Sequence, residues 1–149
     1  MEIALKEAEK SLAYGDVPIG AIITNNGRVI GRGHNKVEKK NNSILHAELI
    51  AINSAIKKIG YKHLLNCEMY ITLEPCSMCA GAIILSRIKK IYIASKDAKS
   101  GAGGSILNIL QNKQLNHRCD VEYGLLENDS SEKIKNFFKE LRTRKTIGN

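Results

Sequence analysis

Two short segments of the chain carry side chains that bind transition metals. His46-Ala47-Glu48 offers one imidazole, and Pro75-Cys76-Ser77-Met78-Cys79 offers two thiols. A catalytic zinc site uses three such ligands and keeps its fourth position for water, whereas a structural site fills that position with protein. The carboxylate of Glu48, two residues after His46, could take a proton from that water. The pattern predicts a catalytic Zn²⁺ site with His46, Cys76 and Cys79 as ligands and Glu48 as the proton shuttle.

A closed structural zinc site is the alternative interpretation of the same cysteines. It needs a fourth protein ligand, and the remaining candidates are His34, His63, His117, Cys67 and Cys119. None of them has a motif-like spacing, and a closed site would leave Glu48 without a role. We therefore favour the open, catalytic site and expect Cys67 and Cys119 to be packing residues, because free cysteine behaves as a small hydrophobe.

The two motifs must be positioned by helix starts. Cys76 and Cys79 are three residues apart, so they share one helical face, and the positive end of the helix dipole favours thiolates there. Pro75 is a residue favoured in the first turn of a helix. His46 and Glu48 are not neighbours on a regular helix. They can reach one site only where a helix begins, and we expect that start at His46.

The rest of the chain indicates one α/β domain. Strands alternate with helices, which predicts a sheet covered by helices. A hairpin turn is expected at Asn25-Asn26-Gly27, a polar loop over 35–42 and a helix end at Gly60. The expected strands are 19–24, 28–34, 69–73, 91–94 and 121–123, and the expected helices are 2–14, 46–59, 76–86, 105–110 and 131–144.

Length, composition and charge limit the classes of protein to which the chain can belong. The 149 residues suffice for one domain with a real core, and no apolar run approaches the ~20 residues of a membrane helix. The N-terminus lacks a secretory pattern, so we expect a cytoplasmic protein with reduced cysteines. The net charge of +8 favours a polyanionic partner such as nucleic acid, although a Lys-, Asn- and Ile-rich genome would also produce it.

Several blocks of sequence together resemble the bacterial tRNA-specific adenosine deaminases, members of the cytidine deaminase-like zinc deaminases. The two metal motifs follow the pattern that these enzymes share. The blocks cover residues 17–21, 33–35, 46–48, 72–82, 86–88, 97–105, 115–118 and 137–142. The metal motif alone is shared with deaminases of cytidine, guanine and other substrates. The Asp97–Ser105 block, Asn116-His117-Arg118 and the tail from Phe137 to Arg142 narrow the resemblance to the tRNA enzymes.

The resemblance implies a fold, an activity and partners. The fold is a three-layer α/β/α domain with a mixed five-stranded sheet, here a single CMP/dCMP-type zinc deaminase domain over residues 1–149. The activity is hydrolytic conversion of adenosine to inosine at the wobble position (34) of tRNA, with release of ammonia. The implied partners are one Zn²⁺ per subunit, the anticodon stem-loop and a second copy in a homodimer, with no membrane. A deaminase of free bases or nucleosides is the alternative.

The resemblance also implies roles for residues outside the metal motif. Asn35 would hydrogen-bond the adenine, and Asp97 would contact the anticodon nucleotides beside the target. Without the resemblance, both would be interpreted as turn residues. Phe137, Phe138 and Arg142 in the basic tail would contact RNA by stacking and by charge, although a Phe pair in an amphipathic helix more often belongs to the core. The loop 41–45 departs from the family pattern, and His34 stands where the family often has an aromatic residue.

Overall fold

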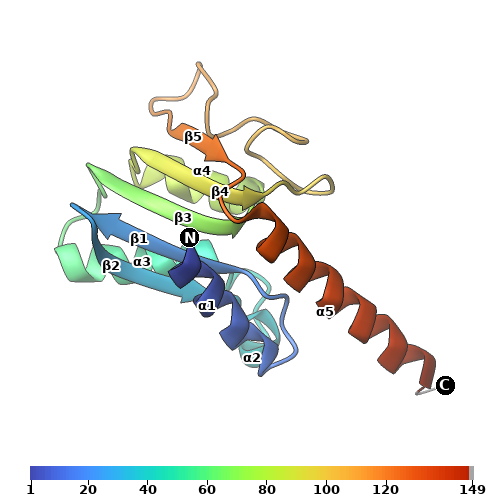
Figure 1. Cartoon of the computed structure of the whole chain (residues 1–149). Coiled ribbons are helices and arrows are strands. Elements are labelled where there is room, and N and C mark those ends of the chain that lie inside the picture. Colours follow the sequence, from blue (N-terminus) through green and yellow to red (C-terminus); the bar gives the residue numbers. More distant parts are fainter. Residues whose placement is uncertain (148–149) are drawn as a thin grey trace.

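The protein forms a five-stranded mixed sheet. A computed structural model describes the backbone of residues 1–147 and the side chains of residues 1–144, so the tail residue Lys145 lies outside the described side chains. The strand order is β2-β1-β3-β4-β5 (Figure 1). The β1–β2 and β1–β3 pairs are antiparallel, whereas β3–β4 and β4–β5 are parallel. The strands are β1 (Gly20–Asn25), β2 (Arg28–His34), β3 (Cys67–Leu73), β4 (Lys90–Ser95) and β5 (Asp120–Tyr123).

Helices cover both faces of the sheet. One face carries α1 and α5, and the other carries α3 and α4, which also contact each other (Figure 1). A short helix, α2, lies in the connection between β2 and α3. The bounds are α1 (Glu2–Leu12), α2 (Val37–Lys40), α3 (Ala47–Ile59), α4 (Ser77–Leu85) and α5 (Glu127–Ile147). The expected three-layer α/β/α fold with a mixed five-stranded sheet is therefore confirmed.

Local sequence explains how the elements begin and end. The β1–β2 hairpin turns at Asn26 and Gly27, whose φ angles of 48° and 74° suit the primed turns that match strand twist. Gly60 ends α3 in the left-handed conformation, with φ of 72°. Both features agree with the sequence-based expectation.

The core lies between the sheet and the α3–α4 layer. Several of its largest fully buried side chains come from the central strands, and Ala51 and Ala55 of α3 pack onto them. The strand members are Ile23, Met69, Ile71, Ile91 and Ile93. Cys67 and Cys119 are also buried in this cluster as free thiols, which confirms their expected packing role.

Glycines in β1 and β2 allow helices to approach the sheet closely. A Cβ atom on Gly20 would lie 2.0 Å from the carbonyl oxygen of Ala4 in α1, and one on Gly33 would lie 2.1 Å from the carbonyl oxygen of Ala47 in α3. Such distances are far inside van der Waals contact. The start of α3, which carries the first metal motif, therefore rests directly on the backbone of β2.

Two expected elements were wrong. Residues 105–110 form no helix, because the backbone N–H of Ser105 donates to the distant carboxylate of Glu74 and an isolated bridge pairs Gly103 with Asn108. The loop expected over 35–42 contains α2, in which the backbone N–H of Glu38 donates to the carboxylate of Asp16. In each case the backbone N–H donates to a carboxylate that is distant in the sequence, so the local sequence could not predict the hydrogen bond.

The last helix is longer than expected and extends beyond the body. Near its start, the hydroxyl of Ser130 donates to the backbone carbonyl of Thr72 in β3 and lies 3.2 Å from the hydroxyl of Ser95 in β4. The C-terminal half of α5 then projects past the sheet (Figure 1). None of the helices within residues 1–147 has both the length and the apolar character needed to cross a lipid bilayer.

Candidate active site

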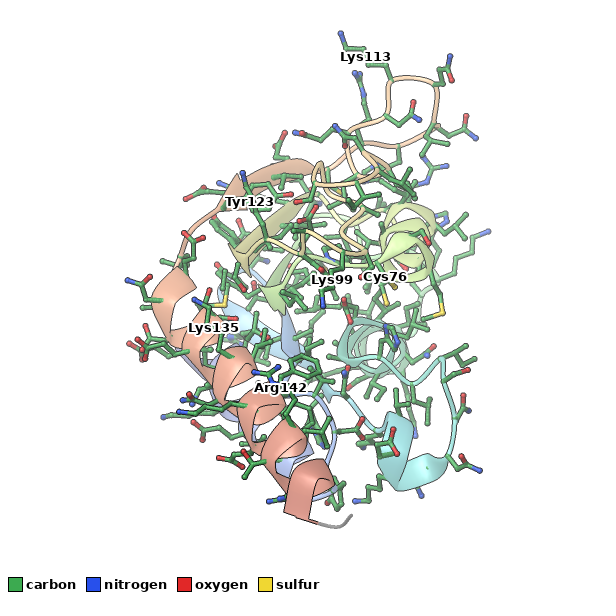
Figure 2. All side chains as sticks on the ribbon, turned by 90° about the vertical axis from the view of Figure 1, so that its right-hand side faces the viewer. Cys76, Lys99, Lys113, Tyr123, Lys135 and Arg142 are labelled. Carbon is green, nitrogen blue, oxygen red and sulfur yellow. The ribbon has the colours of Figure 1, made fainter. Side chains whose placement is uncertain are left out.

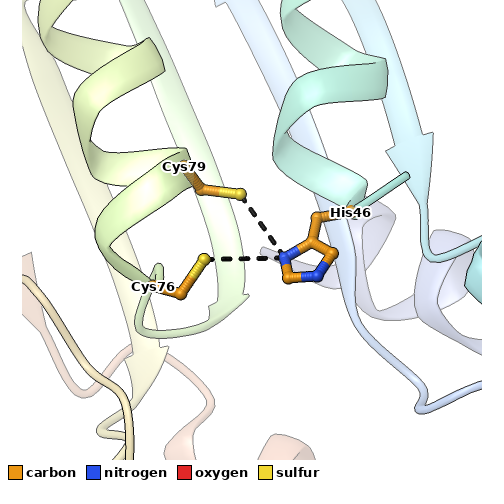
Figure 3. A group of neighbouring side chains, drawn as sticks. All are labelled: His46, Cys76 and Cys79. Atoms are coloured by element: carbon orange, nitrogen blue, oxygen red, sulfur yellow. Dashed lines mark hydrogen bonds between the residues drawn. The ribbon is translucent and has the colours of Figure 1, made fainter. Parts of the chain in front are cut away.

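His46, Cys76 and Cys79 converge from two helix starts. His46 directly precedes α3 in an extended conformation, with φ −76° and ψ 153°, and Cys76 precedes α4 in a similar one. Cys79 lies in the first turn of α4. The Nδ1 atom of His46 is 3.6 Å from the Sγ atom of each cysteine (Figure 3). The irregular helix start that the spacing required is therefore present.

The three side chains could hold one metal ion. Their ligand atoms all lie within 4.8 Å of one another. Among the described residues, no fourth His, Cys, Asp or Glu joins this group. The described residues therefore do not form a closed structural site with four protein ligands. One coordination position remains for a non-protein ligand.

The three side chains differ in how readily they lose a proton. Hydrogen bonds from Cys79 and His46 lower the pKa of the Cys76 thiol to about 4, so it is a thiolate at neutral pH. The hydrogen bond with Cys76 raises the pKa of His46, although burial opposes this. The pKa of Cys79 is also raised, because it lies beside the Cys76 thiolate and is buried. Without a metal ion, the negative charge of the group therefore lies on Cys76, and binding of a metal ion must displace the protons held by His46 and Cys79.

Glu48 lies beside the ligands but outside their group. It occupies the first turn of α3 and is only 4% exposed. Burial raises the pKa of its carboxyl to about 7, and its side chain interacts with the Cys79 thiol. A carboxyl group that titrates near neutrality can both take and give a proton. This is the property expected of a proton shuttle that is not itself a ligand.

A cavity opens next to His46. Its volume is about 550 Å³, and its walls include Asn35, His46, Phe137 and Phe138. Asn35 is 5% exposed, and its Oδ1 atom accepts a hydrogen bond of 3.0 Å from the backbone N–H of Ala47. The amide nitrogen of Asn35 is therefore left to donate to a bound molecule. The fold brings these four sequence-predicted residues to one cavity.

The tail residues lie on α5. The rings of Phe137 and Phe138 meet edge to face with centroids 5.3 Å apart; Phe137 is half-buried and Phe138 is 40% exposed. Arg142 is exposed one turn further along the helix. Figure 2 shows Arg142 on the same face of the molecule as Cys76. The two rings form one side of the cavity, with positive charge beyond them.

Asp97 lies in the loop after β4, and its carboxylate is used within that loop. Its Oδ1 atom accepts from the backbone N–H groups of Lys99, at 2.9 Å, and Ser100, at 3.3 Å. Its Oδ2 atom accepts from the Ser100 hydroxyl, at 2.6 Å. This is the geometry of a turn acid, the interpretation that its local sequence favours.

Two buried acids near the site were missed by the sequence analysis. Asp16 lines the cavity and is 2% exposed, and it directly precedes the 17–21 block. Glu74 is also 2% exposed. It directly precedes Pro75 of the cysteine motif, so its place in the sequence indicated no separate role. Both accept hydrogen bonds from remote backbone N–H groups, which only the fold reveals.

Comparison with known proteins places the chain in a class. A family model for MafB19-like deaminases matches residues 1–142, nearly the whole chain. Solved structures of the same fold include a guanine deaminase from Nitrosomonas europaea, with a TM-score of 0.79 and 24% identity over 91% of this chain and 81% of that one. That likeness extends to the fold alone. The fold and the ligand cluster are thus those of a deaminase.

Closer relatives define the family. The tRNA-specific adenosine deaminase of Bacillus subtilis (strain 168) is 43% identical over 97% of this chain and 90% of the relative. That of Aquifex aeolicus is 44% identical over 95% and 93%. A solved structure from a study of tRNA:A34 deaminases at the wobble position matches with a TM-score of 0.85 and 39% identity, over 89% of this chain and 96% of that one. The chain belongs to the family of tRNA-specific adenosine deaminases and is a hydrolytic deaminase.

Proposed function

We propose that the protein converts adenosine to inosine at the wobble position of a tRNA anticodon, using one Zn²⁺ per subunit. The observation that carries the proposal is the convergence of His46, Cys76 and Cys79 beside buried Glu48, at the edge of an open cavity. Family membership over nearly the whole chain supports the RNA substrate. The basic balance of the sequence, at +8, suits a polyanionic partner.

The spacing of the three ligand atoms supports zinc as the metal. Tetrahedral Zn²⁺ with bonds of about 2.0–2.1 Å to nitrogen and about 2.3 Å to sulfur separates the two atoms by about 3.5 Å. The two distances from His46 Nδ1 to sulfur are 3.6 Å each. When bound, Zn²⁺ supplies the Lewis acidity that lowers the pKa of a water molecule from ~15.7 toward ~7.

Glu48 carries the protons of the reaction. Water and adenosine give inosine and ammonia, so a proton must leave the attacking water and protons must reach the ring nitrogen and the departing amine. Glu48 takes the proton from the water and passes it to the base. Burial raises the pKa of the Glu48 carboxyl to about 7, so near neutral pH this group can both accept and release a proton.

The cavity residues orient the base. The amide nitrogen of Asn35 donates to an acceptor on the purine, because its oxygen is already bound to the N–H of Ala47. Phe138 stacks on a neighbouring base, and Arg142 binds a phosphate with an affinity that falls as salt rises. Asp97 shapes the loop beside the anticodon nucleotides through its bonds to Lys99 and Ser100.

We also propose that the protein is a homodimer in the cytoplasm. The family resemblance implies a homodimer, and three large apolar side chains that such an interface could cover are exposed: Leu85 at 77%, Ile106 at 57% and Ile44 at 53%. A tRNA substrate implies the cytoplasm. We expect Leu85→Asp to shift the protein from dimer to monomer in sedimentation experiments, whereas Leu125→Asp on the α1–α5 face should not. A wild-type protein that sediments as a monomer would contradict the homodimer.

The experiment that tests the function uses purified protein and total tRNA. Inosine is mapped by sequencing after incubation, with Glu48→Ala as the control, and free adenosine, guanine and cytidine are offered in parallel. We expect inosine at the wobble position with the wild-type protein, none with Glu48→Ala, and no turnover of the free compounds. Turnover of a free base or nucleoside without inosine in tRNA would favour the alternative, a small-substrate deaminase.

A further inference from the structure

Glu74 is a buried carboxylate between the cysteine motif and the loop that follows β4. Its Oε1 atom accepts from the backbone N–H groups of Gly103, at 2.9 Å, and Ser105, at 3.0 Å. Its Oε2 atom accepts from the N–H of Asp97, at 2.9 Å, and from the hydroxyl of Ser105. All four donors lie in residues 97–105, which we term the 97–105 loop. A charge buried to this degree must be compensated, and this loop compensates it.

The 97–105 loop is wrapped tightly around this one side chain. A Cβ atom on Gly101 would lie 2.4 Å from the carboxyl carbon of Glu74, and one on Gly103 would lie 2.6 Å from the hydroxyl oxygen of Tyr123. The N–H of Ala102 also donates to the carbonyl of Pro75, at 2.8 Å. The loop is therefore fixed both to Glu74 and to the turn that presents Cys76.

The outer side of the 97–105 loop carries a cation near the site. Lys99 is exposed, and the Asp97 carboxylate holds its backbone N–H. Figure 2 shows Lys99 on the face that also carries Cys76 and Arg142. A rigid loop that carries an ammonium group at this place can bind a phosphate of a substrate whose target base enters the cavity.

We propose that Glu74 is a positioning residue for the RNA substrate: it holds the 97–105 loop against Pro75 so that Lys99 meets a phosphate beside the target nucleotide. This inference rests on the proposed function. Glu74 does not belong to the ligand group, and its oxygens are occupied by the loop, so it acts through other residues. A purely electrostatic effect would have the opposite sign, because removing an acidic group from a basic protein should strengthen its binding to RNA.

The test is Glu74→Gln with an anticodon stem-loop as substrate. The amide NH₂ replaces one acceptor oxygen and faces donors of the loop, so hydrogen bonds are lost and the loop is released. We expect KM to rise about tenfold, kcat to stay within about threefold and zinc content to be unchanged. The dependence of log affinity on log salt should become shallower by about one phosphate contact. Glu68→Gln on β3 removes the same charge and should not raise KM.

A second variant separates positioning from a general structural role. Lys99→Ala should raise KM about fivefold in the wild-type background and cause no further rise in Glu74→Gln, because the released loop no longer presents the lysine. If Glu74→Gln fails to fold, Ser105→Ala removes one bond of the same set and should weaken the Lys99→Ala effect by itself. Additive effects of the two substitutions would overturn the inference.

The outcomes distinguish this inference from the proposed function. An active wild-type protein whose KM is unchanged in Glu74→Gln contradicts the positioning role alone. A wild-type protein that forms no inosine contradicts the proposed function. In that case, equilibrium binding of the stem-loop at several salt concentrations still measures whether Glu74→Gln weakens RNA binding, as positioning requires, or strengthens it, as charge alone predicts.

Discussion

The side-chain oxygen of Asn35 accepts a hydrogen bond from the backbone N–H of Ala47, 3.0 Å away. This bond joins the residue after β2 to the first residue of α3, directly beside His46, which we propose as a metal ligand. It satisfies one of the N–H groups that a helix start leaves unpaired. A residue that faces the cavity therefore also fixes the position of the helix that carries His46 and Glu48.

The two roles of Asn35 can be separated by substitution. Asn35→Asp keeps an oxygen for Ala47 but removes the amide donor and buries a charge, so we expect a fall in kcat/KM of about tenfold to a hundredfold. Asn35→Ala loses both groups and should also cost about 1 kcal/mol of unfolding free energy. Steady-state kinetics and urea unfolding measure the two effects. Full activity in Asn35→Asp would show that the amide does not bind the base.

The metal site gives a direct prediction about composition. The purified protein should contain one zinc per chain by elemental analysis, and a chelator should remove both the metal and the activity until zinc is restored. Cys79→Ala should lose the metal, because two ligands do not make a stable site. Cys67→Ala is the matched control, since Cys67 is buried in the core away from the ligand group. Metal retained in Cys79→Ala would contradict the ligand assignment.

Stability at acid pH should depend on Glu7. This carboxylate is 3% exposed and lies 2.7 Å from Lys10 Nζ, 3.3 Å from His34 Nδ1 and 3.5 Å from Arg32 Nη1. Burial raises the pKa of Glu7, but the hydrogen bonds and charges of Lys10 and His34 outweigh it and hold the pKa below its ordinary value. The ionised form therefore favours folding.

The sign of the pH effect follows from that shift. The contribution of Glu7 is fully present above the unfolded pKa near 4.5 and is lost as pH falls through the lower folded pKa. Glu7→Gln should cost about 1 kcal/mol at pH 7 and flatten the decline of stability below pH ~5. Glu9→Gln, which removes an exposed partner of Lys133, should change neither. Urea unfolding across this pH range measures both, and parallel curves for wild type and Glu7→Gln would contradict the prediction.

Phe138 offers a test of RNA contact on α5. Its ring is 40% exposed and lines the cavity, so Phe138→Ala should remove about 1–3 kcal/mol of stem-loop binding while leaving the melting temperature nearly unchanged. Leu125→Ala, with similar exposure on the α1–α5 face, should leave binding unchanged. A large loss of stability in Phe138→Ala would instead assign the ring to packing. Fluorescence anisotropy and thermal unfolding distinguish the two.

The convergence of His46, Cys76 and Cys79 could be predicted because each motif is short and its spacing fits one local structure. The start of one helix is enough to bring Cys76 and Cys79 together, and the start of another brings His46 and Glu48 together. The strands followed from alternating apolar residues, such as Met69 and Ile71 in β3.

The conformation of residues 97–110 could not be predicted, since Glu74 binds it from 23 to 31 positions away in sequence. We expected a helix over 105–110, but the hydrogen bonds of this segment to a buried carboxylate outweigh a weak local helix preference. The cavity around Asn35 was likewise unpredictable, because it brings Phe137 and Phe138 beside His46 from the far end of the chain.

The contact between Gly33 and the start of α3 makes the enzyme vulnerable at a position outside the residues that we propose to bind metal and RNA. A single methyl group there would meet the carbonyl oxygen of Ala47 at 2.1 Å, and the neighbouring residue His46 would have to move with it. A ligand displaced by even about 1 Å no longer matches the geometry that the reaction requires. Gly33→Ala should therefore yield a protein that still folds around its sheet but has lost its chemistry. A search for inactivating mutations would find this position as readily as the cysteines.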